Sequence, residues 1–117
     1  MAIISNIIID QGATFQADID VTDSAGDALN LSNYQQANGV RGQMRKTYSS
    51  TTAIDFTGQV ESVTGGTVRI SLSATQTHAI KAGRYVYDVE IEHGTTGEVT
   101  RVIEGQVDVT PGVTRAS

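Results

Sequence analysis

A period-two alternation of apolar and polar residues, clearest between residues 84 and 92, constrains the fold of this chain more than any other feature. The apolar positions there are Tyr85, Tyr87, Val89 and Ile91, and the acidic positions are Asp88, Glu90 and Glu92. A period of two places alternate side chains on opposite faces of a strand, so this segment predicts one buried and one wet face. The pattern returns in residues 101–109 after a Gly-Thr turn, which predicts a terminal β-hairpin.

Similar short strands are predicted along the rest of the chain. They cover residues 3–9, 15–22, 40–45, 54–63 and 68–72. Twelve glycines and many Thr and Ser residues suit tight turns between short strands, and residues 73–80 predict a brief helical turn. We therefore predict an all-β fold, an antiparallel β-sandwich of about seven strands with one short helical turn, formed by residues 1–117 as a single domain.

Tyr85 and Tyr87 have the spacing of a known sandwich feature. In immunoglobulin domains a Tyr near the start of strand F stands two residues before the second Cys. Here Tyr85 takes the place of that Tyr, and Tyr87 takes the place of the Cys. We predict structural roles for both, with the Tyr85 hydroxyl bonded to backbone near the 73–80 turn. The alternative is that both are ordinary strand aromatics.

Composition and motif searches argue against several classes of function. The chain has no Cys, which excludes disulfides and thiolate zinc sites. Its net charge of −5 argues against a nucleic-acid binder, which needs a basic surface. His78 and His93 lie in predicted turns without a nucleophile motif, so we expect no enzyme activity, no cofactor and no catalytic or metal-binding residue. A calcium site is the alternative considered for four acidic residues, but they lack the spacing of a calcium-binding loop. We expect them to be solvated acids of a strand and a turn: Asp18, Asp20, Asp23 and Asp27.

The acidic, outward-facing positions of the terminal hairpin are predicted to lie beside a basic strand. In a sandwich of this topology strand C lies beside strand F, which brings Arg41 and Arg45 next to the acidic positions. Cross-strand ion pairs are then expected with Asp88, Glu90 and Glu92. The alternative is that this face is an intersubunit surface.

The N-terminal segment is more apolar than a half-buried strand requires. Its isoleucines are Ile3, Ile4, Ile7, Ile8 and Ile9. The segment lacks the basic region and cleavage site of a signal peptide and is too short to span a membrane. Two interpretations of residues 1–10 stay open: both strand faces are covered within the domain, or one face docks on a partner.

The order and spacing of the predicted elements resemble a known family. The segments that carry the resemblance are Thr14–Val21, Asp23–Leu31, Val40–Arg45, Gly66–Leu72, Ala74–Thr77, Ala82–Ile91 and Glu104–Arg115. Together they look like the immunoglobulin-like domain family found at the start of baseplate upper proteins of tailed phages and as small standalone virion proteins. The resemblance runs from about Gln11 to Arg115. It implies an immunoglobulin-like sandwich without catalytic residues.

The resemblance implies a non-enzymatic structural protein of a tailed-phage virion, made in the host cytoplasm and placed in the tail, baseplate or fibre attachment region. The implied partners are other virion proteins and copies of itself, with no nucleic acid and no membrane. An alternative is a capsid decoration (cement) protein, whose N-terminal strand would add to a neighbour's sheet. A third hypothesis is a carbohydrate-binding adhesion module, for which Tyr34 and Tyr48 are the candidate aromatic platforms.

Overall fold

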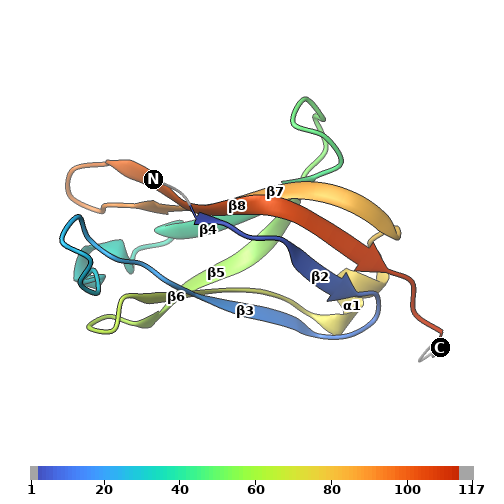
Figure 1. The fold of residues 1–117 in the computed structure, drawn as a ribbon, viewed down its shortest axis with the longest axis horizontal. Helices are drawn as coiled ribbons and strands as arrows, with labels where there is room; N and C mark the ends of the chain where they lie inside the picture. Colours follow the sequence, from blue (N-terminus) through green and yellow to red (C-terminus); the bar gives the residue numbers. More distant parts are fainter. Residues whose placement is uncertain (1–2, 114–117) are drawn as a thin grey trace.

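The computed structural model describes residues 3–113, about half of which lie in β-strands (Figure 1). The strands are β1 (Ile3–Ile4), β2 (Ile7–Asp10), β3 (Phe15–Asp20), β4 (Val40–Arg45), β5 (Ile54–Ser62), β6 (Thr67–Leu72), β7 (Gly83–Glu92) and β8 (Val99–Thr110). A short α-helix, α1 (Ala74–His78), and a 3-10 turn, η1 (Ser32–Tyr34), lie in the connections. The predicted all-β fold with short strands and a helical turn near residues 73–80 is confirmed.

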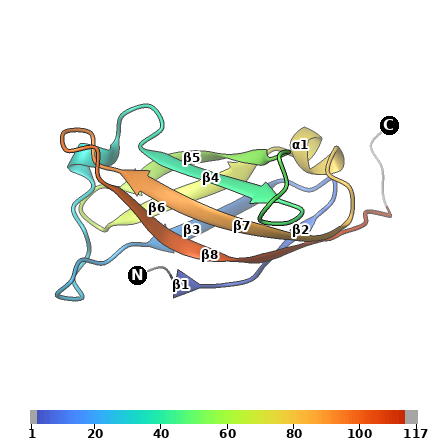
Figure 2. The same ribbon diagram turned by 90° about the horizontal axis from the view of Figure 1, so that it is seen from above.

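The strands follow one continuous order, β1–β8–β7–β4–β5–β6–β3, with β2 also paired to β8. β5 joins the two layers, because Ile54–Phe56 pairs with β4 whereas residues 57–62 pair with β6. Gly58 permits this crossing, since a Cβ at that position would clash with the Val40 carbonyl. The sheet curls on itself into a sandwich, with β4, β7 and β8 over β3 and β6 (Figures 1 and 2).

The sheet is mixed rather than purely antiparallel. β1 and β2 both pair parallel to β8, and the register is constant from Ile3 opposite Ile103 to Asp10 opposite Thr110. The two short strands are therefore one interrupted strand, as the break at Ser5 and Asn6 predicts. This strand lies at the edge of its layer and runs in the same direction as β8 (Figure 1). The sheet therefore differs here from the antiparallel arrangement that the sequence predicted.

The core lies between the two layers and consists of the inward-facing apolar side chains of the strands. Its fully buried side chains include Ile9, Leu31, Met44, Val68, Ile70, Leu72, Val89, Ile91 and Val107. Full burial of such a side chain contributes about 1.5–3 kcal/mol relative to exposure. The predicted inward parity of β7 is confirmed, because its buried side chains are those of Tyr85, Tyr87, Val89 and Ile91.

The helical turn α1 is fixed at its start by a capping box. Ser73 Oγ accepts from the Gln76 N–H at 3.2 Å, and Gln76 Oε1 accepts from the Ser73 N–H at 2.8 Å. The helix ends at His78 with Ala79 as its cap, and Gly83 begins β7. Among the described residues no helix is long and apolar enough to cross a membrane.

Candidate interaction surfaces

The N-terminal strand presents an apolar surface at an open edge of the sheet. Ile9 is fully buried and Ile7 packs against the core, whereas the exposed fractions of Ile3, Ile4 and Ile8 are 56%, 79% and 66%. Coverage of both strand faces within the described residues is therefore excluded. We call Ile3, Ile4 and Ile8 the isoleucine edge.

Polar contacts at the break between β1 and β2 hold this strand in place. The Ser5 N–H donates to the Glu104 carbonyl at 2.9 Å, and the Gln106 N–H donates to Asn6 Oδ1 at 3.0 Å. The Tyr87 hydroxyl donates to the Ser5 carbonyl at 2.6 Å. Burial raises the pKa of Tyr87, so its hydroxyl stays protonated and able to donate up to a higher pH than that of an exposed tyrosine. The isoleucine edge is thus anchored from behind by the core.

Gly105 makes this anchor sterically possible. A Cβ at Gly105 would clash with the Ser5 carbonyl oxygen and would lie 3.0 Å from Asn6 Oδ1. Sequence reasoning missed the anchor formed by Ser5, Asn6, Tyr87 and Gly105. The available signals were a glycine inside a predicted strand, which often marks close backbone approach, and two polar residues that interrupt an apolar strand.

Tyr85 makes the contact that a tyrosine corner requires. Its hydroxyl donates to the Lys81 carbonyl at 2.6 Å, four residues upstream and just after α1. The Lys46 ammonium lies 4.9 Å from the centre of the Tyr85 ring, within range of a cation–π interaction. Tyr85 therefore ties the start of β7 to the preceding turn.

The outer face of β4 and β7 carries charges that pair across the strands. Arg41 lies opposite Glu90, and its guanidinium is 3.3 Å from Glu90 and 2.9 Å from Glu92. The hydrogen bond to Glu92, together with that to Glu90, raises the pKa of Arg41 above its usual value. The predicted pairing is confirmed for Arg41. Exposed pairs of this kind contribute only about 0.2–1 kcal/mol.

The predicted pairing of Arg45 is wrong. Arg45 instead donates to the Ser50 carbonyl at 2.6 Å and to Gln43 Oε1 at 2.9 Å, because the loop after β4 folds back toward it. Asp88 faces Gln43 in register and pairs with Arg101 of β8 at 3.4 Å. Burial raises the pKa of Asp88, and nearby carboxylates add to this effect against the opposing influence of Arg101.

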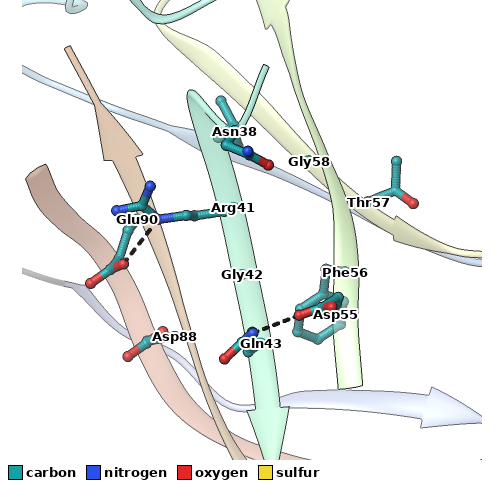
Figure 3. A pocket seen from close by; sticks show the side chains of 11 residues that line it. Asn38, Arg41, Gly42, Gln43, Asp55, Phe56, Thr57, Gly58, Asp88 and Glu90 are labelled. Atoms are coloured by element: carbon teal, nitrogen blue, oxygen red, sulfur yellow. Dashed lines mark hydrogen bonds and ion pairs between the residues drawn. The ribbon is translucent and has the colours of Figure 1, made fainter. Parts of the chain in front are cut away.

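Two adjoining hollows lie on this outer face. The larger, of about 590 Å³, opens where β5 leaves β4, and there Gln43 Nε2 donates to Asp55 Oδ1 at 2.6 Å (Figure 3). The smaller, of about 370 Å³, lies between Tyr48 and Arg101. The residues common to both are Gln43, Asp88 and Glu90. The linings combine amides, carboxylates and guanidinium groups, which can hydrogen-bond a polar ligand.

The two candidate aromatic platforms differ in availability. Tyr34 packs edge-on against His93, with 5.3 Å between ring centres. Tyr48 is 82% exposed and lines the smaller hollow. Of these two residues, Tyr48 is the one that a ligand in the hollow would contact.

The acids of β3 pair with neighbouring side chains. Asp18 contacts Arg69 at 2.7 and 3.1 Å, and Asp20 accepts from Thr67 Oγ1 at 3.0 Å. The hydrogen bond from Arg69 lowers the pKa of Asp18 below its usual value. Asp23 caps its own turn by accepting from the N–H groups of residues 25 and 27. Across residues 3–113, no group of three or more His, Asp or Glu side chains could hold a metal ion.

Comparisons with known proteins show similarity at the level of fold. No family model and no curated protein matches the chain. InlP of Listeria monocytogenes is similar over 91% of this chain and 26% of its own, with a TM-score of 0.53 and 21% identity. A family 123 glycoside hydrolase from Clostridium perfringens is similar over 94% of this chain and 23% of its own, with a TM-score of 0.42 and 11% identity. The chain thus spans about a quarter of these proteins, and the likeness to InlP concerns the fold alone.

Proposed function

We propose that the chain is a non-enzymatic structural protein of a tailed-phage virion that acts through protein–protein contacts. The observation that carries the proposal is the isoleucine edge, which is anchored from behind and exposed in front. The resemblance to immunoglobulin-like virion domains supplies the class of protein. A rigid sandwich with an exposed apolar edge suits a module that assembles with neighbours.

The isoleucine edge offers enough apolar surface to drive a contact. Fully burying one isoleucine side chain contributes about 1.5–3 kcal/mol. The three side chains are each more than half exposed, so covering them makes available roughly 3–6 kcal/mol before the costs of association. A partner strand would add backbone hydrogen bonds along the open edge.

The position of the protein on the particle tests this role. With a label at the C-terminus, electron microscopy of assembled virions is expected to show the label at the tail, baseplate or fibre attachment region. Label on the capsid would favour the cement alternative. Purified particles without the label and without peptides of this chain would contradict a virion role.

The isoleucine edge has its own test within that experiment. Replacing Ile4 and Ile8 by Lys places two charges on the exposed edge without altering the buried face. The variant is expected to fold but to be lost from particles. Val99→Lys, at another exposed apolar position, is the matched control and should still be incorporated.

The smaller hollow favours a second candidate function, binding of a short saccharide. It places the exposed Tyr48 ring beside the polar groups of Asp88 and Arg101, a combination that suits a sugar face and its hydroxyls. Glycan-array binding that is lost in Tyr48→Ala and kept in Tyr34→Ala would support this function. The absence of glycan binding by the wild type would discard it.

A further inference from the structure

The backbone of the N-terminal strand has a free side with a defined hydrogen-bonding pattern. The N–H groups of Ser5 and Gln11 donate to β8 carbonyls, at 2.9 and 3.0 Å. In a parallel ladder alternate residues bond to the same neighbour, so odd-numbered residues here face β8. The backbone groups of Ile4, Asn6 and Ile8 therefore point away from β8, toward the open edge.

The side chains of Ile4 and Ile8 share the outer face of the sheet, where both are exposed. Ile4 lies in register with Glu104, and Ile8 lies in register with Asp108. A strand added at this edge would thus meet two exposed isoleucines on one face and bond to alternate residues of the backbone.

Charge distinguishes this edge from the β3 edge, which carries Asp18 and Asp20. Residues 3–9 contain no charged side chain, although the whole chain carries a net charge of −5. Two copies of an acidic protein repel when their charged faces approach, and like charges directly opposite each other destabilise strand pairs. The N-terminal strand is a segment along which two copies can meet without that repulsion.

We propose that the N-terminal strand pairs antiparallel with the same strand of a second copy, about a twofold axis at Asn6. This inference names a partner for the proposed assembly role and rests on it. In this register Ile4 of each copy lies opposite Ile8 of the other, and both sit at positions whose free backbone groups face each other. The β8 layers of the two copies then join into one continuous sheet.

Neighbouring registers are poorer. Shifting one strand by two residues in one direction places Asp10 opposite Ile4 and leaves Ile8 opposite Asn6. Shifting it in the other direction places Ile4 opposite Asn6 and leaves Ile8 without an isoleucine partner. A shift by one residue brings bonded backbone groups to the interface instead of free ones. The register centred on Asn6 is the one that matches both isoleucines.

The paired surface is small, so the dimer is expected to be weak in dilute solution. A stable interface usually buries about 1,200–2,000 Å² in total, and one strand pair buries less. High local concentration within an assembled particle would favour the same contact.

Cysteine cross-linking tests the register directly, because the chain has no native Cys. Opposed Cα atoms of a bonded antiparallel pair lie about 5.5 Å apart, within disulfide range. A mixture of Ile4→Cys and Ile8→Cys proteins should therefore cross-link under mild oxidation. Each variant alone should cross-link little, since identical residues of the two copies are offset by roughly 14 Å along the strands.

Val99→Cys mixed with Ile8→Cys measures background collisions at another exposed position. A 4–8 cross-link well above that background supports the pairing. Equal yields in the mixture and in the single variants, or yields at background, overturn it. Particle incorporation is scored separately. Incorporation without the cross-link discards the pairing and keeps the virion role. A cross-link without incorporation discards the virion role and keeps the pairing.

Discussion

The two open edges of the sheet differ in how they are protected. β3 ends the strand order on one side and carries Asp18 and Asp20, with Asp18 paired to Arg69. The N-terminal strand ends the order on the other side and exposes Ile4 and Ile8 without any charge between residues 3 and 9. Charged side chains on an edge strand discourage pairing with another chain. Charge thus discourages pairing at the β3 edge, whereas the N-terminal edge lacks this protection.

This difference shows that exposure alone does not define an interaction edge. Within residues 3–113 both edge strands lack a strand partner on one side. Of the two, the N-terminal strand is the one that exposes large apolar side chains and is held from behind. That support comes from Tyr87 and Gly105, which hold the strand against β8, so the same backbone groups always face the open edge.

The most damaging change to the open edge is Gly105→Ala. The new Cβ would clash with the Ser5 carbonyl, so β1 and β2 must move away from β8. We expect a loss of about 2–3 kcal/mol in the free energy of unfolding and faster hydrogen exchange in residues 7–10. Denaturant unfolding and exchange measure both. Gln106→Ala, at the exposed neighbour, should change little; a similar loss in both variants would contradict the role of Gly105.

Tyr87→Phe and Tyr85→Phe form a matched pair that separates the two tyrosine contacts. Each variant leaves one backbone carbonyl without its hydroxyl partner and is expected to cost about 1–2 kcal/mol. Exchange should rise at residues 3–8 in Tyr87→Phe but at residues 79–82 in Tyr85→Phe. Identical exchange patterns would show that neither tyrosine anchors a particular segment.

Removing the charges of β3 should make the two edges alike. Asp18→Thr with Asp20→Thr leaves an uncharged edge, and we expect association beyond dimers because each copy can then pair on both sides. Sedimentation velocity measures the size distribution. Asp55→Thr with Glu98→Thr removes the same charge away from β3 and should not produce these larger species; if it does, net charge rather than the edge controls association.

The smallest expected effect concerns the charged outer face. The pKa of Asp88 is raised in the folded state, so the ionised carboxylate lowers stability above that pKa, and protonation relieves the cost as the pH falls toward 3.8. Asp88→Asn should therefore be slightly more stable than wild type at pH 7, with a difference that shrinks on acidification. Thermal unfolding between pH 7 and 4 measures it. A difference that grows on acidification would contradict this account.

Much of the fold follows from side-chain periodicity. Strand positions and inward parity depend on local alternation, so residues 15–20, 40–45 and 83–92 could be assigned from the sequence. The pairing of Arg41 with Glu90 also follows, because it requires only the correct neighbour strand and parity.

The remaining features depend on distances that local patterns do not encode. The bond between Tyr87 and Ser5 joins residues 82 positions apart, and its geometry requires the parallel placement of the N-terminal strand. Arg45 has the same parity as Arg41, but loop geometry directs it to Ser50 instead of a carboxylate. The isoleucine cluster predicted an unusual strand, whereas its exposure could be established only from the folded arrangement.

Sedimentation equilibrium on the wild type and on the Ile4→Lys, Ile8→Lys double variant tests whether the N-terminal strand pairs with a second copy. We expect a concentration-dependent monomer–dimer equilibrium for the wild type, its loss in the double variant, and its retention in Val99→Lys. A wild type that stays monomeric at millimolar concentration, or a dimer that survives both lysine substitutions, would contradict an open isoleucine edge that pairs with a second copy.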